Sequence, residues 1–413
     1  LKPVRGTQDI LPNESRLYRY VEEQAFYVAE RYGFGEISTP IFEFTEVFSR
    51  TLGDTSDIVT KEMYTFEDKG GDLITLRPEG TAGIARAFIS NGLQQHLPLK
   101  VFYRGPMFRY ERPQKGRRRQ FHQIGVEILG VPTAQADIEA ISLASTFLEE
   151  LGLKDSVTLE INSLGDTSSR LAYRKKLIEY LNHHKNKLSN ESLDRLERNP
   201  LRILDSKNEE DKKLLDSAPK LQDSLNNESK IFYKQLCEGL NSLQIPFKQN
   251  TNLVRGLDYY CHTAFEFTTT NLGAQGTVLA GGRYDKLISE MGGPETPGIG
   301  WAAGVERLTL LLSETQSTEK KRPITVIPVN TSIETKAVVI AERLRKQGYR
   351  IDLAYSGSLK KRMKRAHEAN AIATILLDNE GLLNNVIKLK NMDSGEQNDV
   401  SLETLDNYLK IYK

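Results

Sequence analysis

The sequence predicts an α+β fold: an antiparallel sheet with flanking helices, a helical insertion, and a small α/β domain at the carboxyl end. Three observations support this prediction. Residues 1–167 mix helix and strand patterns, and strand patterns resume near residue 250. Residues 168–249 are polar and helical, with few β-branched runs. After residue 322 strands alternate with helices, which is typical of a parallel or mixed sheet.

The insertion, residues 168–249, is expected to divide the first domain into residues 1–167 and 250–314. This domain opens with an amphipathic helix near residues 15–34, because apolar side chains recur there on one face. Four later stretches have strand character and lie at residues 72–77, 101–111, 253–260 and 262–269.

The second domain is expected at residues 323–413, after a charged linker at residues 315–322. Its strand patterns alternate with helix patterns at residues 334–348 and 358–371. Five of the seven residues 359–365 are basic, and on a helix they would spread over more than one face. This pattern indicates either a solvated surface or contact with phosphates.

The composition is that of an ordinary globular protein, 38% hydrophobic and 27% charged, with a formal net charge of +1. No run of 18 apolar residues is present, so no membrane span is expected. The amino-terminal stretch lacks the apolar core of a signal peptide. With only Cys237 and Cys261, neither a disulfide framework nor a thiolate metal site is expected, and a reducing cytoplasm is the simplest location.

Positive charge is concentrated in one predicted hairpin. Between Arg109 and Arg119 there are five arginines and one lysine against a single acid, Glu111. If the flanking stretches are strands, Arg109 and Glu111 share a face with Gln123 and Glu127, and a glycine at 125 leaves room between the last two. A solvated sheet face with salt bridges is the default interpretation. A sheet face with both positive and negative side chains, next to a positively charged loop, would also suit a zwitterionic ligand bound beside a polyphosphate or a nucleic acid.

Three further stretches contain candidate site residues. Glu79 and Thr81 lie between a strand and a helix, where they could hold an ammonium group, or where Thr81 could simply cap a helix that begins near residue 82. Arg307 opens a mostly apolar helix, so it needs an anion or a protein carboxylate as its partner. Arg255 precedes a double tyrosine, Tyr259 and Tyr260. The adjacent Cys261 and His262 have no second ligand pair, and we expect no metal site there.

These stretches together resemble the histidyl-tRNA synthetase family of bacterial type, which belongs to the class II aminoacyl-tRNA synthetases. Residues 108–128 are similar to the second signature of the class, residues 298–312 to the third, and residues 32–43, with Pro40, to the first. The stretches "RGLDYY" and "AGGRYDKL" resemble the two motifs particular to the histidine enzymes. The resemblance covers essentially the whole chain, with departures at "CHTAFE" and "LDNEGLL".

The resemblance implies an enzyme that attaches L-histidine to tRNA(His) through a histidyl-adenylate, with ATP as a substrate and Mg²⁺ bound to the ATP. It also implies a homodimer, because the first signature lies at the dimer interface of the class. Arg109 would contact the α-phosphate, and Arg307 and Arg117 the distal phosphates. Glu111 would orient the adenine or the ribose. Arg255 would bridge the histidine carboxylate and the α-phosphate.

The same resemblance implies a histidine pocket. Its ammonium-binding residues would be Glu79, Thr81 and Gln123. A neutral imidazole offers one donor and one acceptor, which Glu127 and Tyr260 would serve. The remaining histidine contacts would come from Arg109, Arg255, Tyr259 and Tyr284. Because buried polar partners reject analogues by ~10⁴–10⁵, no editing domain is needed. The 168–249 insertion is then a tRNA-binding or structural element, and residues 323–413 an anticodon-binding domain.

The sequence also allows three alternative functions. A non-catalytic regulatory paralogue of the histidine pathway would share the catalytic fold but lack the carboxyl-terminal tRNA domain. A class II synthetase for another amino acid, such as threonine or proline, would lack the two histidine-type motifs. A plain RNA-binding protein would show no histidine-dependent exchange between ATP and pyrophosphate.

Overall fold

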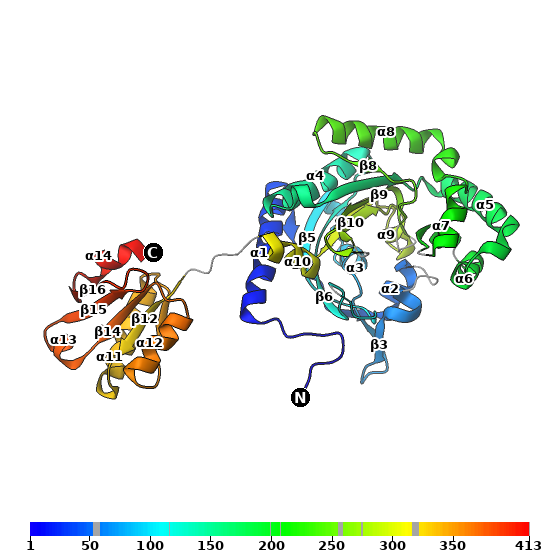
Figure 1. The fold of residues 1–413 in the computed structure, drawn as a ribbon. Helices are drawn as coiled ribbons and strands as arrows, with labels where there is room; N and C mark the ends of the chain where they lie inside the picture. The colour runs from blue at the N-terminus through cyan, green and yellow to red at the C-terminus, as the bar shows by residue number, and fades with distance from the viewer. Residues whose placement is uncertain are drawn as a thin grey trace. The chain divides into compact units, whose positions relative to one another are not determined.

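The computed structural model describes residues 1–52, 58–114, 116–198, 200–206, 208–254, 259–273, 276–315 and 322–412. The chain forms two compact units, Leu1–Ser317 and Thr318–Lys413 (Figure 1). The first unit carries a large, mainly antiparallel sheet and the second a mixed sheet, so the predicted α+β class is confirmed.

The first unit is organised around an eight-stranded sheet with the order β1-β5-β6-β11-β10-β9-β7-β8. Neighbouring strands are antiparallel except in the outer pairs β1–β5 and β7–β8. Its strands are β1 (Gly35–Glu36), β5 (Leu99–Phe108), β6 (Gln120–Leu129), β7 (Thr158–Ser163), β8 (Lys248–Gln249), β9 (Cys261–Thr268), β10 (Thr277–Arg283) and β11 (Gly298–Gly304).

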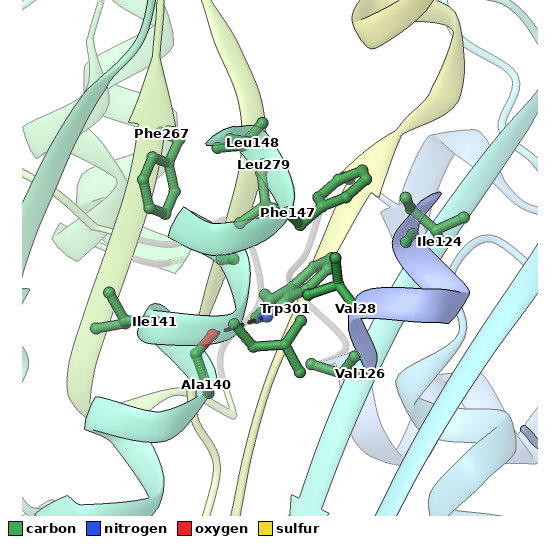
Figure 2. Packing of buried hydrophobic residues seen from close by; sticks show 14 of the residues in the cluster. Val28, Ile124, Val126, Ala140, Ile141, Phe147, Leu148, Phe267, Leu279 and Trp301 are labelled. Carbon is green, nitrogen blue, oxygen red and sulfur yellow. Dashed lines mark hydrogen bonds between the residues drawn. The ribbon is translucent and has the colours of Figure 1, made fainter. Parts of the chain in front are cut away.

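One face of this sheet is buried under α1 (Pro12–Arg31), α4 (Ala134–Glu150) and α10 (Val305–Thr315). Figure 2 shows the centre of that core, where Trp301 of β11 stacks on Phe147 and donates its indole N–H to the Ala140 carbonyl at 3.0 Å. Trp301 pairs with Val126 across the strands. Because side chains alternate along a strand, Gln123, Gly125 and Glu127 point to the opposite face.

The opposite face is partly covered by α2 (Thr45–Leu52), α3 (Thr81–Ser90) and the short α9 (Leu287–Glu290). A three-stranded sheet with the order β2-β4-β3 lies beside α2 and comprises β2 (Phe42–Phe44), β3 (Tyr64–Glu67) and β4 (Leu73–Leu76).

The insertion is helical, as the sequence predicted, and consists of α5 (Thr167–His183), α6 (Asn190–Arg198), α7 (Glu209–Asp216) and α8 (Asn227–Ser242) (Figure 1). Side-chain caps explain where three of these helices begin: Asp166, Asn208 and Asn226 accept backbone N–H groups of α5, α7 and α8. The buried carboxylate of Asp211 accepts three serine hydroxyls, from Ser189, Ser192 and Ser206, and so ties α7 to the α6 region.

The second unit has a five-stranded sheet with the order β13-β12-β14-β15-β16, in which β12 is parallel to both neighbours and the last two pairings are antiparallel. Its strands are β12 (Ile324–Pro328), β13 (Ile351–Leu353), β14 (Ala373–Leu377), β15 (Val386–Asn391) and β16 (Gln397–Ser401). Its helices are α11 (Glu334–Lys346), α12 (Leu359–Glu368), α13 (Asn379–Leu383) and α14 (Leu405–Leu409).

Two predicted strands end differently in the structure. The strand predicted at 101–111 ends at Phe108. The Arg109 backbone N–H still donates to the Arg119 carbonyl at 2.8 Å, and its side chain donates the Nε–H to the Pro78 carbonyl. The stretch 253–260 was predicted as a strand, but residues 253–254 and 259–260 lie outside strands. Tyr259 and Tyr260 instead pack against each other, with ring centroids 4.6 Å apart. Residues 255–258, and residues 316–321 of the predicted linker, lie outside the described residues.

Candidate active site

A cavity of about 740 Å³ lies on the face of the eight-stranded sheet opposite α1, α4 and α10. It brings together most of the predicted site residues from β6, α3, α10, the hairpin loop and the aromatic stretch near residue 260. The residues that line it include Glu79, Thr81, Arg109, Glu111, Arg117, Gln123, Tyr259, Tyr260, Tyr284 and Arg307. Glu127 adjoins the cavity through hydrogen bonds to two of these residues, and Arg255 lies outside the described residues.

Glu127 is the most deeply buried acid of the group, with 1% of its surface exposed. The Thr81 hydroxyl donates to its Oε1 at 2.7 Å, and the Tyr284 hydroxyl donates to its Oε2. Burial raises the pKa of Glu127 to about 8, against the opposing effect of the two hydroxyl donors. Because this pKa lies near neutral pH, a ligand that donates or accepts a proton can change the protonation state of Glu127.

Glu79 caps α3, which excludes the alternative in which Thr81 merely caps the helix and Glu79 is exposed. The two carboxylate oxygens of Glu79 accept the backbone N–H groups of Thr81 and Ala82, each at 2.7 Å. The Thr81 hydroxyl is therefore released from capping and donates to Glu127. The helix begins at residue 81 instead of 82, and burial raises the pKa of Glu79.

The space above Gly125 is filled by a neighbouring ring, so the expectation of an open gap between Gln123 and Glu127 is wrong. A Cβ at position 125 would come within 2.4 Å of the Tyr103 ring, and a Cβ at Gly80 within 2.2 Å of the same ring. A Cβ at Gly300 would overlap the Glu127 carboxylate at 1.7 Å. The glycines thus leave room for the buried side chains of Tyr103 and Glu127, which come from the adjacent strands β5 and β6 and pack beneath the cavity.

Three buried polar atoms around the cavity make no hydrogen bond with the described residues: the Tyr103 hydroxyl, the Tyr259 hydroxyl and Gln123 Oε1. Buried polar groups in folded proteins are almost always paired, because an unpaired one costs about 1–3 kcal/mol. Their convergence indicates that the cavity receives a polar ligand with several donors and acceptors.

The other end of the cavity is cationic. Arg109 is fixed by its Nε–H bond to Pro78 at 2.8 Å and by its position 5.3 Å over the Phe121 ring. Arg117 donates to Glu111 at 2.9 Å. Burial, with the nearby charges of Arg117 and Arg109, lowers the pKa of Arg307. Three guanidiniums that repel one another around one opening form a site for a polyanion.

Several residues in or beside the cavity were missed by the sequence analysis: Tyr103 lies beneath it, and the others line it. Tyr103 lies two residues from Val101 on the pocket face of β5, and alternation alone could have placed it there. Glu160 and Glu266 face each other across β7 and β9, and Lys212 and Asp216 of α7 line the cavity from the insertion. Those long-range neighbours leave no local signal in the sequence.

Arg283, from the stretch "AGGRYDKL", has a structural role instead of lining the cavity. It is fully buried and paired with Asp137, and it also donates to Asp285 at 3.0 Å and to two backbone carbonyls. Removing one partner of such a pair would leave an uncompensated buried charge, so this pair anchors β10 against α4.

The fold and the matches to two family models show that the protein is a class II aminoacyl-tRNA synthetase. A model described as an anticodon binding domain matches residues 324–411, and one described as Histidyl-tRNA synthetase matches residues 6–308. The chain therefore belongs to the histidyl-tRNA synthetase family. Among the described helices, none combines the length and hydrophobicity needed to cross a bilayer.

Curated relatives match along nearly their whole length. A protein of Rhodospirillum rubrum named Histidine–tRNA ligase is 58% identical over 409 residues, 99% of this chain and 98% of its own. A protein of Gluconobacter oxydans with the same name is 53% identical over 98% of this chain and 97% of its own. The crystal structure of apo S. aureus histidyl-tRNA synthetase is 37% identical, covers 99% of both chains and superposes with a TM-score of 0.83.

Proposed function

We propose that this chain attaches L-histidine to tRNA(His) at the expense of ATP. A histidine carboxylate oxygen attacks the α-phosphorus of ATP, and pyrophosphate leaves. The ribose hydroxyl at the tRNA 3′ end then attacks the histidyl carbonyl, and AMP leaves. The observation that carries the proposal is one cavity in which a carboxylate- and tyrosine-lined pocket adjoins three converging guanidiniums. The full-length match to relatives named Histidine–tRNA ligase supports it.

At the cationic end, the arginines would stabilise charge that develops on the phosphates. Arg109 would meet the α-phosphate, and Arg307 and Arg117 the distal phosphates, since arginine grips phosphate oxygens bidentately. Glu111, held by Arg117, would orient the adenine or the ribose. Arg255 would bridge the histidine carboxylate and the α-phosphate. ATP would enter as its magnesium complex, in which the cation contacts the phosphates.

At the other end, the polar groups match the histidine zwitterion. Gln123 Oε1 is an unpaired acceptor for the ammonium. Thr81 and Glu79 retain free lone pairs after their internal bonds, so they can accept from the same group. Glu127 would take one imidazole N–H and Tyr260 would serve the other ring nitrogen. Tyr259 and Tyr284 would complete the walls, as their burial against Tyr260 and Glu127 suggests.

Glu127→Gln is expected to raise the KM for histidine about 5- to 150-fold and leave the KM for ATP nearly unchanged. The expected cost is about 1–3 kcal/mol, because only the imidazole loses a carboxyl oxygen that accepts its N–H. The measurement is histidine-dependent ATP–pyrophosphate exchange with each substrate varied. Glu139→Gln is the matched control: it removes a carboxylate of α4 that pairs with Lys100 of β5. Equal increases in both Michaelis constants would refute the role.

We further propose that residues 1–167 and 250–314 form the catalytic domain, residues 168–249 an insertion that closes one side of the cavity, and residues 323–413 the anticodon-binding domain, working in the cytoplasm. The contribution of Lys212 and Asp216 to the cavity wall supports the role of the insertion. A structure titled as an ATP phosphoribosyltransferase regulatory subunit/histidyl-tRNA synthetase from Bacillus halodurans shares the fold at 23% identity and a TM-score of 0.65. The anticodon-domain match and the arginine set favour the catalytic function over a regulatory one.

The three-stranded sheet supports a homodimer, because several of its aromatic side chains are exposed while polar side chains on its other face are buried. Phe42, Phe44 and Phe66 expose 56%, 53% and 48% of their surfaces, whereas Glu43 is buried against Arg86 and Thr75 is fully buried. A sheet that turns its aromatic side outward and its polar side inward needs a cover for the aromatic side. The first strand of this sheet begins within the stretch 32–43 that resembles the first class signature, so we propose that a second copy of the chain covers the aromatic side.

Phe44→Glu is expected to weaken the dimer on the order of 10²-fold, because it places a charge in the centre of an apolar contact. Sedimentation equilibrium would show the unchanged chain as a dimer and the variant shifted toward monomer. Leu171→Glu changes an equally exposed leucine on α5 and should leave the dimer intact. A variant as dimeric as the unchanged chain would place the interface elsewhere.

A further inference from the structure

The insertion begins beside the double tyrosine that lines the cavity. Strand β7 ends just before Leu164, and α5 starts at Thr167. Between these two elements, the Leu164 N–H donates to the His262 carbonyl at 2.6 Å, and the His262 N–H donates to the Gly165 carbonyl at 2.8 Å. Backbone hydrogen bonds therefore join the first residues of the insertion to the segment that follows Tyr260.

The start of the insertion is held in place by its own helix caps. Asp166 caps α5 by accepting the Ser169 N–H at 2.8 Å, and Asn226, the cap of α8, donates its side-chain amide to Asp166 at 2.8 Å. The Ser169 hydroxyl in turn accepts the Asn226 N–H at 3.0 Å. Because the first turns of α5 and α8 are bonded to each other, a side chain in the first turn of α5 has a fixed place relative to residues 260–262.

Arg170, in the first turn of α5, connects the insertion to the proposed histidine pocket. Its guanidinium donates an Nη1–H to the Tyr260 carbonyl at 2.7 Å. Three residues further along the helix, Tyr173 is buried in the same hydrophobic cluster as Tyr259 and Tyr260. The insertion therefore supports the pocket wall by apolar packing and by one directed, charge-assisted hydrogen bond.

The chain on either side of the Tyr260 carbonyl has little freedom. A Cβ at Gly282 of β10 would come within 2.8 Å of the Tyr260 ring, and the ring also packs on Tyr259, with centroids 4.6 Å apart. His262 has a left-handed backbone, with φ of 44°, a conformation that persists in a residue with a side chain only where its surroundings fix it. The Tyr260 carbonyl thus belongs to a peptide group between a packed ring and a constrained turn, and its direction is coupled to both.

We propose that Arg170 is a positioning residue for histidine. By holding the Tyr260 carbonyl, it fixes the Tyr260 hydroxyl at the imidazole nitrogen and makes histidine recognition depend on the insertion. The inference rests on the proposed function and extends it to a residue that acts through Tyr260 without touching the substrate. A small displacement of the hydroxyl is enough to lose the contact, because hydrogen bonds weaken steeply with distance and angle.

The test is histidine-dependent ATP–pyrophosphate exchange by the full-length protein, with each substrate varied. Arg170→Met keeps an unbranched side chain but removes the donors. It should raise the KM for histidine about tenfold, the scale of one hydrogen bond, and leave the KM for ATP nearly unchanged. Arg170→Lys restores a charged donor and should show a smaller rise. Arg174→Met changes an exposed arginine one turn further along α5 and is the matched control.

A double-mutant cycle separates positioning from general support of the fold. Tyr260→Phe removes the hydroxyl and should by itself raise the KM for histidine about tenfold. If Arg170 acts through that hydroxyl, adding Arg170→Met to Tyr260→Phe should raise this KM by less than about threefold more. Should Arg170→Met fail to fold, Arg170→Lys takes its place in the cycle.

Three results would overturn the role of Arg170 while the proposed function stands. They are additive effects in the cycle, equal rises in the KM for ATP and for histidine, and an Arg170→Met protein that matches the Arg174→Met control. If the unchanged chain shows no histidine-dependent exchange, the proposed function itself fails.

Discussion

Arg109→Lys is expected to reduce histidine-dependent ATP–pyrophosphate exchange on the order of 10²–10³-fold in a protein that remains folded. Arg109 uses Nε to hold the Pro78 carbonyl and lies over Phe121, which leaves its outer nitrogens for the cavity. A lysine keeps the charge but loses the planar fork, so it cannot hold the carbonyl and a phosphate together. Because the phosphate contact strengthens as charge develops, the loss should appear in kcat.

The matched control for this variant is Arg104→Lys. Arg104 lies on the same strand, β5, but its guanidinium pairs with Glu36 away from the cavity, at 2.9 Å. Exposed pairs of this kind contribute about 0–1 kcal/mol to stability, and exchange should stay near that of the unchanged chain. A near-normal kcat in folded Arg109→Lys would remove Arg109 from the reaction.

A fragment that ends at residue 321 is expected to retain histidine-dependent exchange and to lose aminoacylation by about 10²-fold or more. The proposed ligands from Glu79 to Arg307 all precede the cut, and each unit has its own hydrophobic core. Two linked binding surfaces can gain 10²–10⁴ in avidity over either alone. Without the second unit, the fragment should bind tRNA weakly although adenylate formation continues.

Salt dependence provides the second measurement on the fragment. The rate of charging by the full chain should fall more steeply with salt concentration than the residual rate of the fragment. The reason is that the fragment lacks the second unit and therefore the phosphate contacts that this unit makes. The fragment keeps the aromatic sheet and should remain a dimer. A dimeric fragment that charges tRNA as well as the intact chain would show that residues 323–413 do not bind the anticodon arm.

The periodic parts of the fold could be predicted from the sequence. The helices α1 and α11 repeat their apolar residues with a clear period, and the helices predicted at 15–34 and 334–348 lie within a few residues of the observed ones. The stretch 253–260 failed because aromatic residues favour strands by composition, whereas Tyr259 and Tyr260 are held by packing around the cavity. Propensity does not encode that tertiary contact.

The candidate site was predictable where charge stood out. Clustered arginines and a polar strand face led to Arg109, Gln123 and Glu127, which the structure places around one cavity. The capping of α3 by Glu79 could not be predicted from the sequence. The choice between Glu79 and Thr81 depends on Glu127, which lies 46 residues away from Thr81. Tyr103 escaped because a tyrosine in a buried strand resembles core until its neighbours are known.

The glycine floor also limits how this cavity can be changed by evolution or design. At Gly80, Gly125, Gly298 and Gly300 a methyl group would collide with a ring or a carboxylate from another segment of the chain. A side chain at 125 therefore requires both a smaller residue at Tyr103 and a shift of the Trp301 carbonyl oxygen, which would lie 2.7 Å from the added Cβ. Each single step passes through an overpacked intermediate. The shape of this part of the cavity is therefore expected to resist change by single substitutions.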